Sequence, residues 1–151
     1  MNTGAEKSTD ITNLAVQLPE KFQHLKMLVL FGSRARGDFR PNSDWDFAAV
    51  YDEAIYQNLT ENPFAVFEIS GIISNLLNIP ESKIDVIDLG RCSALLAHYV
   101  ARDGKVLYEQ EPGQFEQFRR QALKSHAEMK ATYQSLRAKL DERLQNWGYD
   151  D

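Results

Sequence analysis

The sequence GSRARGDFRPNSDWDF, residues 32–47, is the segment around which the chain is organised. The apolar run Met27–Phe31 precedes it and reads as a buried strand. Its last residues open a second predicted strand, Asp44–Tyr51, in which Asp44 and Asp46 point to the same face, about 6.6 Å apart along the chain. Two carboxylates displayed together on a rigid strand are suited to holding hard divalent cations such as Mg²⁺.

The first two residues of the same segment suit a phosphate. Gly32 lets the backbone come close to a phosphate group, and Ser33 supplies a hydroxyl and a main-chain N–H at a strand-to-helix turn, where anions are favoured. A metal site beside a phosphate site indicates phosphoryl or nucleotidyl transfer. The competing explanation is that the two acids are solvated turn residues, but it does not account for the glycine-serine turn that precedes them.

Three arginines follow the glycine-serine turn. Arg34 or Arg36 can add charge-assisted hydrogen bonds to a bound nucleotide, and Arg40 belongs to the same basic cluster. Each of the three can equally be an ordinary surface charge.

Gly-Ser, ten residues and then Asp-x-Asp resembles the signature of the DNA polymerase beta superfamily of nucleotidyltransferases. The fuller form, GSRARG at 32–37 with SDWD at 43–46, resembles the minimal nucleotidyltransferases (MNT), the small antitoxins of HEPN–MNT toxin–antitoxin modules. The resemblance implies a polymerase beta-like fold of the α/β (α+β) class. Its small mixed β-sheet of about four strands is flanked by helices, with a long C-terminal helix.

A third predicted strand, residues 82–89, carries two further acids. Asp85 and Asp88 do not share one face under strict alternation, so one faces the site and the other faces elsewhere. We choose Asp85, because it lies early in its strand as Asp46 does, and because the resemblance places a third carboxylate there. Asp88 is expected to cap a helix beginning near Cys92.

The resemblance implies ATP as substrate and two Mg²⁺ ions, about 3.5–4 Å apart, held by Asp44, Asp46 and Asp85. Asp85 could also accept the proton of the attacking hydroxyl. Ser33 and the adjacent amides are expected to bind the β- and γ-phosphates. Without metal, three converging carboxylates repel one another, and at least one tends to stay protonated.

The rest of the chain alternates predicted helices and strands. Residues 1–8 are expected to be disordered, and the helix that follows is expected either to end at Pro19 or to open a second turn there. Pro63 can start a helix running to Leu77. Its expected core residues are Phe64, Phe67, Ile69, Ile72, Ile73, Leu76 and Leu77. A helix ending near Gly104 and a fourth strand over Lys105–Glu109 complete the expected sheet.

The longest predicted element is a helix over residues 112–147. Its apolar stripe consists of Phe115, Phe118, Ala122, Met129, Tyr133, Leu136, Leu140, Leu144 and Trp147. Such a helix would overrun a domain of this size, so its second half is expected to be an exposed arm for a partner or a second copy. A break in the helix, with the second part folding back, is an equally good interpretation.

Length and composition fit one globular domain over residues 1–151. The net charge of −5 argues against a broad nucleic-acid-binding surface, and no apolar run approaches the length of a membrane span. Cys92 is the single cysteine, which favours a reducing compartment and a cytoplasmic location. The three histidines show no metal-ligand spacing.

The resemblance also supplies an acceptor. MNT antitoxins transfer AMP from ATP to a tyrosine of the cognate HEPN toxin, a ribonuclease, and so silence it. Two alternatives stay open: a small-molecule nucleotidyltransferase of the aminoglycoside type, and a non-enzymatic antitoxin that neutralises by stoichiometric binding through its C-terminal helix.

Overall fold

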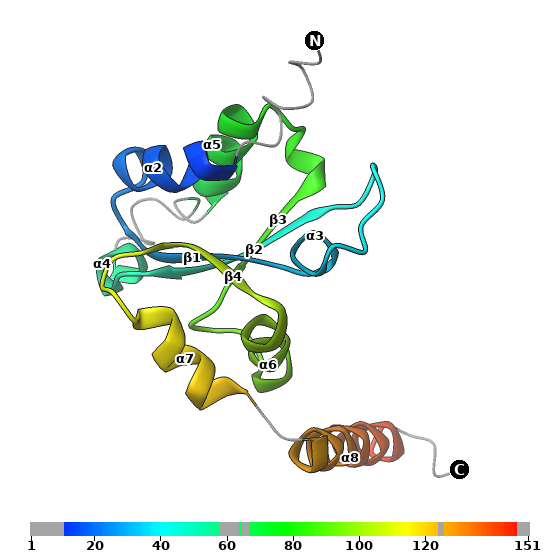
Figure 1. Ribbon diagram of the computed structural model, residues 1–151. Coiled ribbons are helices and arrows are strands. Elements are labelled where there is room, and N and C mark those ends of the chain that lie inside the picture. The colour runs from blue at the N-terminus through cyan, green and yellow to red at the C-terminus, as the bar shows by residue number, and fades with distance from the viewer. Residues whose placement is uncertain (1–10, 58–63, 65–66, 124–125, 148–151) are drawn as a thin grey trace.

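The fold is built on a four-stranded mixed sheet with strand order β3-β2-β1-β4, seen in the computed structural model of Figure 1. The strands are β1 (Leu25–Phe31), β2 (Trp45–Tyr51), β3 (Ile84–Asp88) and β4 (Lys105–Glu109). β1 pairs antiparallel with both β2 and β4, whereas β2 and β3 run parallel. The structure describes residues 11–57, 64, 67–123 and 126–147. Residues 1–8, expected to be disordered, and Pro63 lie outside this part of the chain.

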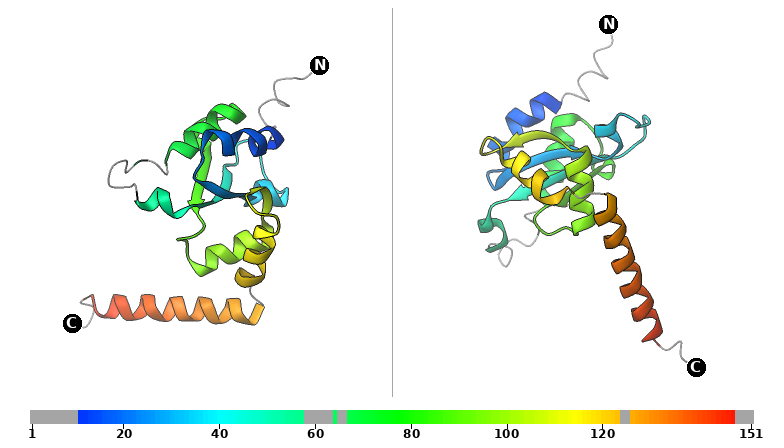
Figure 2. Two further views of the ribbon diagram at one scale, coloured as in Figure 1. Left: turned by 90° about the vertical axis from the view of Figure 1, so that its left-hand side faces the viewer. Right: turned by 60° about the horizontal axis from the view of Figure 1, so that its bottom comes forward.

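Helices cover both faces of the sheet. The helices α2 (Ile11–Lys21) and α5 (Glu68–Leu77) lie on one face, and α6 (Ala94–Asp103) and α7 (Gln114–Ala122) lie on the other (Figure 1). Short helical turns, α3 (Ser33–Arg36), α4 (Glu53–Gln57) and η3 (Glu81–Lys83), connect them. The last helix, α8 (His126–Gln145), extends away from these layers as a separate rod (Figure 2). Among the described residues, none of these helices is both long and apolar enough to cross a bilayer.

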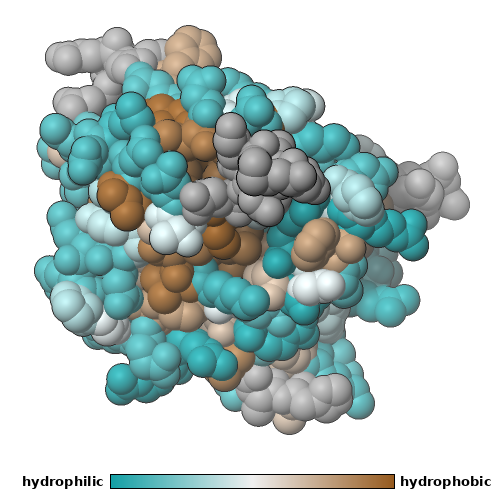
Figure 3. Space-filling view, turned by 45° about the horizontal axis from the view of Figure 1, so that its top comes forward, coloured by the Kyte–Doolittle hydropathy of each residue, from teal (hydrophilic) through white to brown (hydrophobic). Residues whose placement is uncertain are grey.

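Two hydrophobic cores follow from the alternation of β1 and β2. Leu28 and Leu30 join Phe47 on the face of α2 and α5. Val29 and Ala48 point to the opposite face, where Val100 of α6 and Phe115 of α7 pack on them. Asp46 has the same parity as Ala48, so it lies on the α6 face at the end of the sheet. On the α2 and α5 side, Figure 3 shows hydrophobic surface gathered into one band between hydrophilic margins.

In the first half of the chain the structure selects one of the two alternatives predicted at Pro19 and corrects one expectation for the second helix. Pro19 does not end the first helix, because α2 continues to Lys21 while Leu14 and Leu18 are fully buried. Packing of that face outweighs the hydrogen bond that a proline cannot donate. In the second helix, Phe64 and Phe67 are not core residues, being 69% and 66% exposed. That helix begins only at Glu68, and its buried residues are Ile69, Ile73 and Leu77.

Of the two interpretations of residues 112–147, the single long helix is wrong and the predicted break is present. The described chain has two helices there, α7 and α8, and Leu123 after the first has an extended backbone. The predicted stripe is weakest at this point, since polar Ser125 and His126 stand between Ala122 and Met129. The break lets Phe115 pack into the core while α8 leaves the sheet. The stripe of α8 is exposed, with Tyr133 53%, Leu136 48%, Leu140 55% and Leu144 42%, as is Trp147, just after the helix, at 79%.

Candidate active site

The end of β1 and the beginnings of β2 and β3 lie side by side at one end of the sheet and bring the predicted site residues together. Phe31, the last residue of β1, pairs with Asp46 on β2. Asp46 in turn lies beside Asp85 on the parallel strand β3. Gly32, which follows β1, is therefore next to one carboxylate and one strand away from another. Asp44 is exposed and lies one residue before β2, so the observed strand is one residue shorter than predicted.

Gly32 is needed here for two separate reasons. Its backbone has φ 75° and ψ −158°, a region that side-chain-bearing residues essentially never occupy. A Cβ at this position would lie 2.4 Å from Oδ2 of Asp46. The glycine thus leaves space beside the carboxylate that any other residue would fill.

The turn after Gly32 presents backbone donors. The N–H groups of Ala35 and Arg36 both donate to the carbonyl of Gly32, at 3.1 and 3.0 Å. The amides of Ser33 and Arg34 stand before them in the first turn of α3, where amides have no intrahelical acceptor. These amides and the Ser33 hydroxyl lie in the turn directly after Gly32, beside the carboxylates.

Electrostatic repulsion marks Asp46 as the centre of the acidic group. Burial raises the pKa of Asp46, and the charges of Asp85 and Asp44 raise it further, while Arg36 opposes the shift. The three carboxylates are thus close enough to affect one another's ionisation. Among the described residues, however, no three His, Cys, Asp or Glu side chains are gathered tightly enough to form a metal site.

The donor set nevertheless fits a hard divalent cation. All three side chains offer carboxylate oxygens, the ligands that Mg²⁺ prefers, and a bound cation would relieve the repulsion that raises the pKa of Asp46. The space kept open by Gly32 lies directly beside the Asp46 carboxylate.

Arg34 is engaged within the loop rather than directed at a ligand. Its guanidinium lies between two aromatic rings, 4.5 Å from the centroid of Phe39 and 4.3 Å from that of Trp45. Its Nη2 donates to three carbonyl oxygens, those of Arg40 (3.4 Å), Pro41 (3.2 Å) and Ser43 (3.0 Å). These contacts stabilise the loop that precedes Asp44, a role that the sequence did not suggest for this arginine.

Arg36 has looser partners and remains near the acids. Its side chain is 41% exposed and forms two long ion pairs of 3.4 Å, from Nε to Asp38 and from Nη1 to Asp103. Its charge lowers the pKa of Asp46, so it lies within electrostatic reach of the site. Asp103, the last residue of α6, was not among the predicted site residues, because it lies 67 positions along the chain from Arg36.

Asp88 has a different role from the one expected. It accepts hydrogen bonds from the Tyr56 hydroxyl and from the Gly90 N–H, so it fixes the turn after β3. The cap of α6 is Ser93, whose Oγ accepts from the N–H of Leu96 at 3.1 Å. The prediction that Asp88 caps this helix is wrong, because a four-residue turn separates the strand end from the cap.

The single cysteine and the described histidines show no catalytic setting. Burial raises the pKa of Cys92, which disfavours the reactive thiolate. His24 forms a 2.9 Å hydrogen bond with Asp52, which follows the end of β2 opposite Asp46. His98 is a buried residue of α6, 5% exposed.

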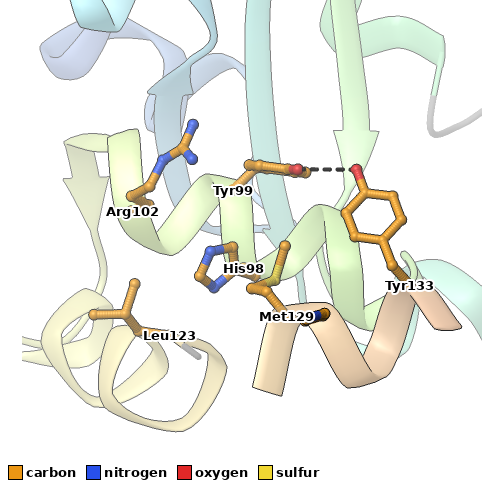
Figure 4. A pocket seen from close by; sticks show the side chains of 7 residues that line it. His98, Tyr99, Arg102, Leu123, Met129 and Tyr133 are labelled. Atoms are coloured by element: carbon orange, nitrogen blue, oxygen red, sulfur yellow. Dashed lines mark hydrogen bonds between the residues drawn. The ribbon is translucent and has the colours of Figure 1, made fainter. Parts of the chain in front are cut away.

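A cavity of about 740 Å³ lies between α6 and α8 (Figure 4). It is lined by His98, Tyr99, Arg102, Leu123, Met129, Lys130 and Tyr133. The Tyr99 and Tyr133 hydroxyls are 3.2 Å apart, which is the hydrogen bond drawn in Figure 4. The predicted site residues do not line it. Sequence analysis missed it because it depends on how α8 lies against α6.

A glycine-serine turn beside carboxylates on two neighbouring strands suits metal-assisted transfer of a phosphate-containing group. The chain belongs to the polymerase beta nucleotidyltransferase family, whose model matches residues 13–113. This confirms the predicted fold and the predicted class of enzyme.

The similar proteins are antitoxins and adenylyltransferases. The chain is 45% identical, over 140 residues, to the protein adenylyltransferase MntA of Aphanizomenon flos-aquae (strain 2012/KM1/D3), covering 92% of this chain and 93% of that protein. A toxin–antitoxin crystal structure with AMP-PNP matches with TM-score 0.55 and 23% identity, covering 89% of this chain and 96% of that one. A chain in a structure of a tri-AMPylated Shewanella oneidensis HEPN toxin in complex with MNT antitoxin matches with TM-score 0.51 and 20% identity, covering 92% of this chain and 97% of that one.

Proposed function

We propose that this chain is a Mg²⁺-dependent protein adenylyltransferase antitoxin that transfers AMP from ATP to a tyrosine of a cognate HEPN ribonuclease toxin, in the cytoplasm. The observation that carries the proposal is the intact acidic edge, Asp46 beside Asp85 with Asp44 before the strand, in a chain 45% identical to a protein adenylyltransferase. A chain that had lost catalysis would have no need to keep mutually repelling acids or the glycine beside them.

In the proposed reaction the tyrosine oxygen forms a bond to the α-phosphorus of ATP, and the bond to pyrophosphate breaks. Asp44, Asp46 and Asp85 would hold Mg²⁺, which when bound neutralises phosphate charge and lowers the pKa of the attacking hydroxyl. Asp85, exposed at the start of β3, is placed to accept the tyrosine proton. The first-turn amides and the Ser33 hydroxyl hold the β- and γ-phosphates, which keeps pyrophosphate oriented as the leaving group.

Arg36 is the arginine that we assign to the phosphates. It lies near Asp46, and its two ion pairs use Nε and Nη1, so Nη2 can contact a phosphate. Arg34 supports the site indirectly through the loop contacts of its guanidinium.

The test uses the purified chain, Mg²⁺ and ATP labelled at the α-phosphate, with and without a HEPN protein encoded beside it. We expect label on a tyrosine of the HEPN protein, and no label when the Asp44→Asn/Asp46→Asn double variant replaces the chain. A tight complex that stays unlabelled would contradict the proposal and favour neutralisation by binding. Label on an aminoglycoside but not on the protein would favour the small-molecule alternative.

The exposed stripe of α8 is the surface that we propose for holding the toxin. Leu136 and Leu140 are half-exposed on a helix that carries no core residue, so replacing them should not disturb folding. We expect Leu136→Glu/Leu140→Glu to weaken the complex at least about tenfold, because two buried apolar contacts are lost and charges are introduced. Calorimetric titration of the HEPN protein measures this.

The matched control is Ala138→Glu, which adds a charge to the opposite side of the same exposed helix. It should leave the affinity within about twofold. Equal affinity for the stripe variant and the unmodified chain would show that α8 is not the docking surface.

A further inference from the structure

Asp103 is a partly buried acid at the end of α6 that contacts Arg36 of the candidate site. Its side chain is only 12% exposed, although it ends a surface helix. Arg102 donates to both of its oxygens, Nε to Oδ1 and Nη2 to Oδ2, each at 2.9 Å. This forked pair fixes the plane of the carboxylate, and the bonds from Arg102 and then Arg36 hold the pKa of Asp103 below its usual range.

On the side toward the candidate active site, the Asp103 carboxylate contacts Arg36. Oδ2 of Asp103 accepts from Nη1 of Arg36 at 3.4 Å, while Asp38 takes Nε at the same distance. Within the described part of the chain Nη2 of Arg36 has no partner. The guanidinium is therefore held by two nitrogens and presents a third, which suits a group that must contact a phosphate without moving far.

We propose that Asp103 is a positioning residue, which orients Arg36 toward the phosphates of the bound nucleotide. Asp103 does not contact the nucleotide itself. Its orientation comes from Arg102, whose guanidinium lies 4.8 Å from the ring centroid of Tyr99 on the wall of the α6–α8 cavity (Figure 4).

The two acids around Arg36 differ in how firmly they can hold it. Asp38 is 64% exposed on the loop, so its attraction is screened by water and salt. The Asp103 side chain is only 12% exposed and is already oriented by the forked pair with Arg102, so it does not need to be ordered when it pairs with Arg36. Asp38→Asn is therefore a matched control for Asp103→Asn, since both remove one carboxylate from the same guanidinium.

The test measures affinity for the ATP analogue α,β-methylene-ATP by calorimetric titration with Mg²⁺ and without any acceptor protein. The methylene group between the α- and β-phosphates of this analogue cannot be cleaved by transfer. Asp103→Asn should weaken binding about 3- to 10-fold, Arg36→Ala about 10- to 100-fold, and Asp38→Asn less than about twofold. Because Asp103 acts through Arg36, the double variant Arg36→Ala/Asp103→Asn should bind no more weakly than Arg36→Ala alone.

In the transfer assay Asp103→Asn should raise KM for ATP and leave kcat nearly unchanged, which a general loss of folding would not do. Unchanged or tighter binding by Asp103→Asn would overturn the inference, as would additive losses in the double variant.

The inference rests on the proposed function only in taking a nucleoside triphosphate as ligand. If the unmodified chain fails to bind the analogue, the nucleotide site and the positioning role both fall. If it binds, and Asp103→Asn binds equally well, only the positioning role falls. A failure of AMP transfer to the HEPN protein would leave this binding result intact.

Discussion

Replacing Asp46 with asparagine should lower nucleotidyl transfer by about 10³-fold or more while making the metal-free protein more stable. The activity falls because the central carboxylate of the proposed metal site loses its charge, and such sites contribute several kcal/mol to the transition state. The stability rises because the half-buried carboxylate is desolvated and faces the charges of Asp85 and Asp44. Transfer of labelled AMP measures the first effect, and thermal unfolding in EDTA at pH 7 measures the second.

The pH dependence gives the sign of the stability effect independently. The pKa of Asp46 is raised in the folded protein above its ordinary value of 3.8. At pH values between the pKa of the unfolded chain and that of the folded protein, the folded protein therefore binds more protons. This contribution to stability therefore falls as pH rises through that window and remains unfavourable above it. Asp46→Asn should remove this fall.

Asp141→Asn, which removes an exposed carboxylate from α8, is the control and should change neither activity nor the pH profile. Lower stability of Asp46→Asn than of the unmodified chain at pH 7 would contradict the repulsion that we derive.

The placement of the candidate site residues could be predicted from the sequence because it depends on local patterns. A glycine-serine turn after an apolar strand, and alternation within the next strand, place Gly32, Ser33 and Asp46 with little help from the rest of the chain. The choice of Asp85 could also be predicted, since Asp85 and Asp88 cannot both face the side of the strand that carries the site. Parallel pairing of β3 with β2 then places Asp85 beside Asp46.

The features that sequence analysis missed depend on contacts between distant segments. Arg34 stacks on Trp45 and Arg36 reaches Asp103, and neither pairing leaves a periodic signal in the sequence. A break in the last predicted helix was one of two interpretations, but its position after Ala122 was not predicted, because the apolar spacing continues at helical steps on both sides of it. Periodicity identifies which face of a helix is apolar, but not what that face packs against.

Gly32→Ala should cost about 1–3 kcal/mol of stability and about 10²-fold in activity. The backbone at φ 75° and ψ −158° strains any residue with a side chain, and the added Cβ would lie 2.4 Å from Oδ2 of Asp46. Relieving that contact requires the carboxylate to move by about an ångström, a displacement large enough to account for the loss of activity. Chemical denaturation and AMP transfer to the HEPN protein measure the two effects on the same preparations.

Gly37→Ala separates backbone strain from displacement of the carboxylate. Gly37 also has a positive φ, 94°, in the same loop, but a Cβ there would meet nothing within 4 Å. It should therefore lose about 1–2 kcal/mol of stability and keep most of its activity. If both alanine variants lose activity in proportion to their stability, the glycine beside Asp46 serves the loop alone. Loss of activity in Gly32→Ala beyond its loss of stability shows that the space beside the carboxylate is part of the active site.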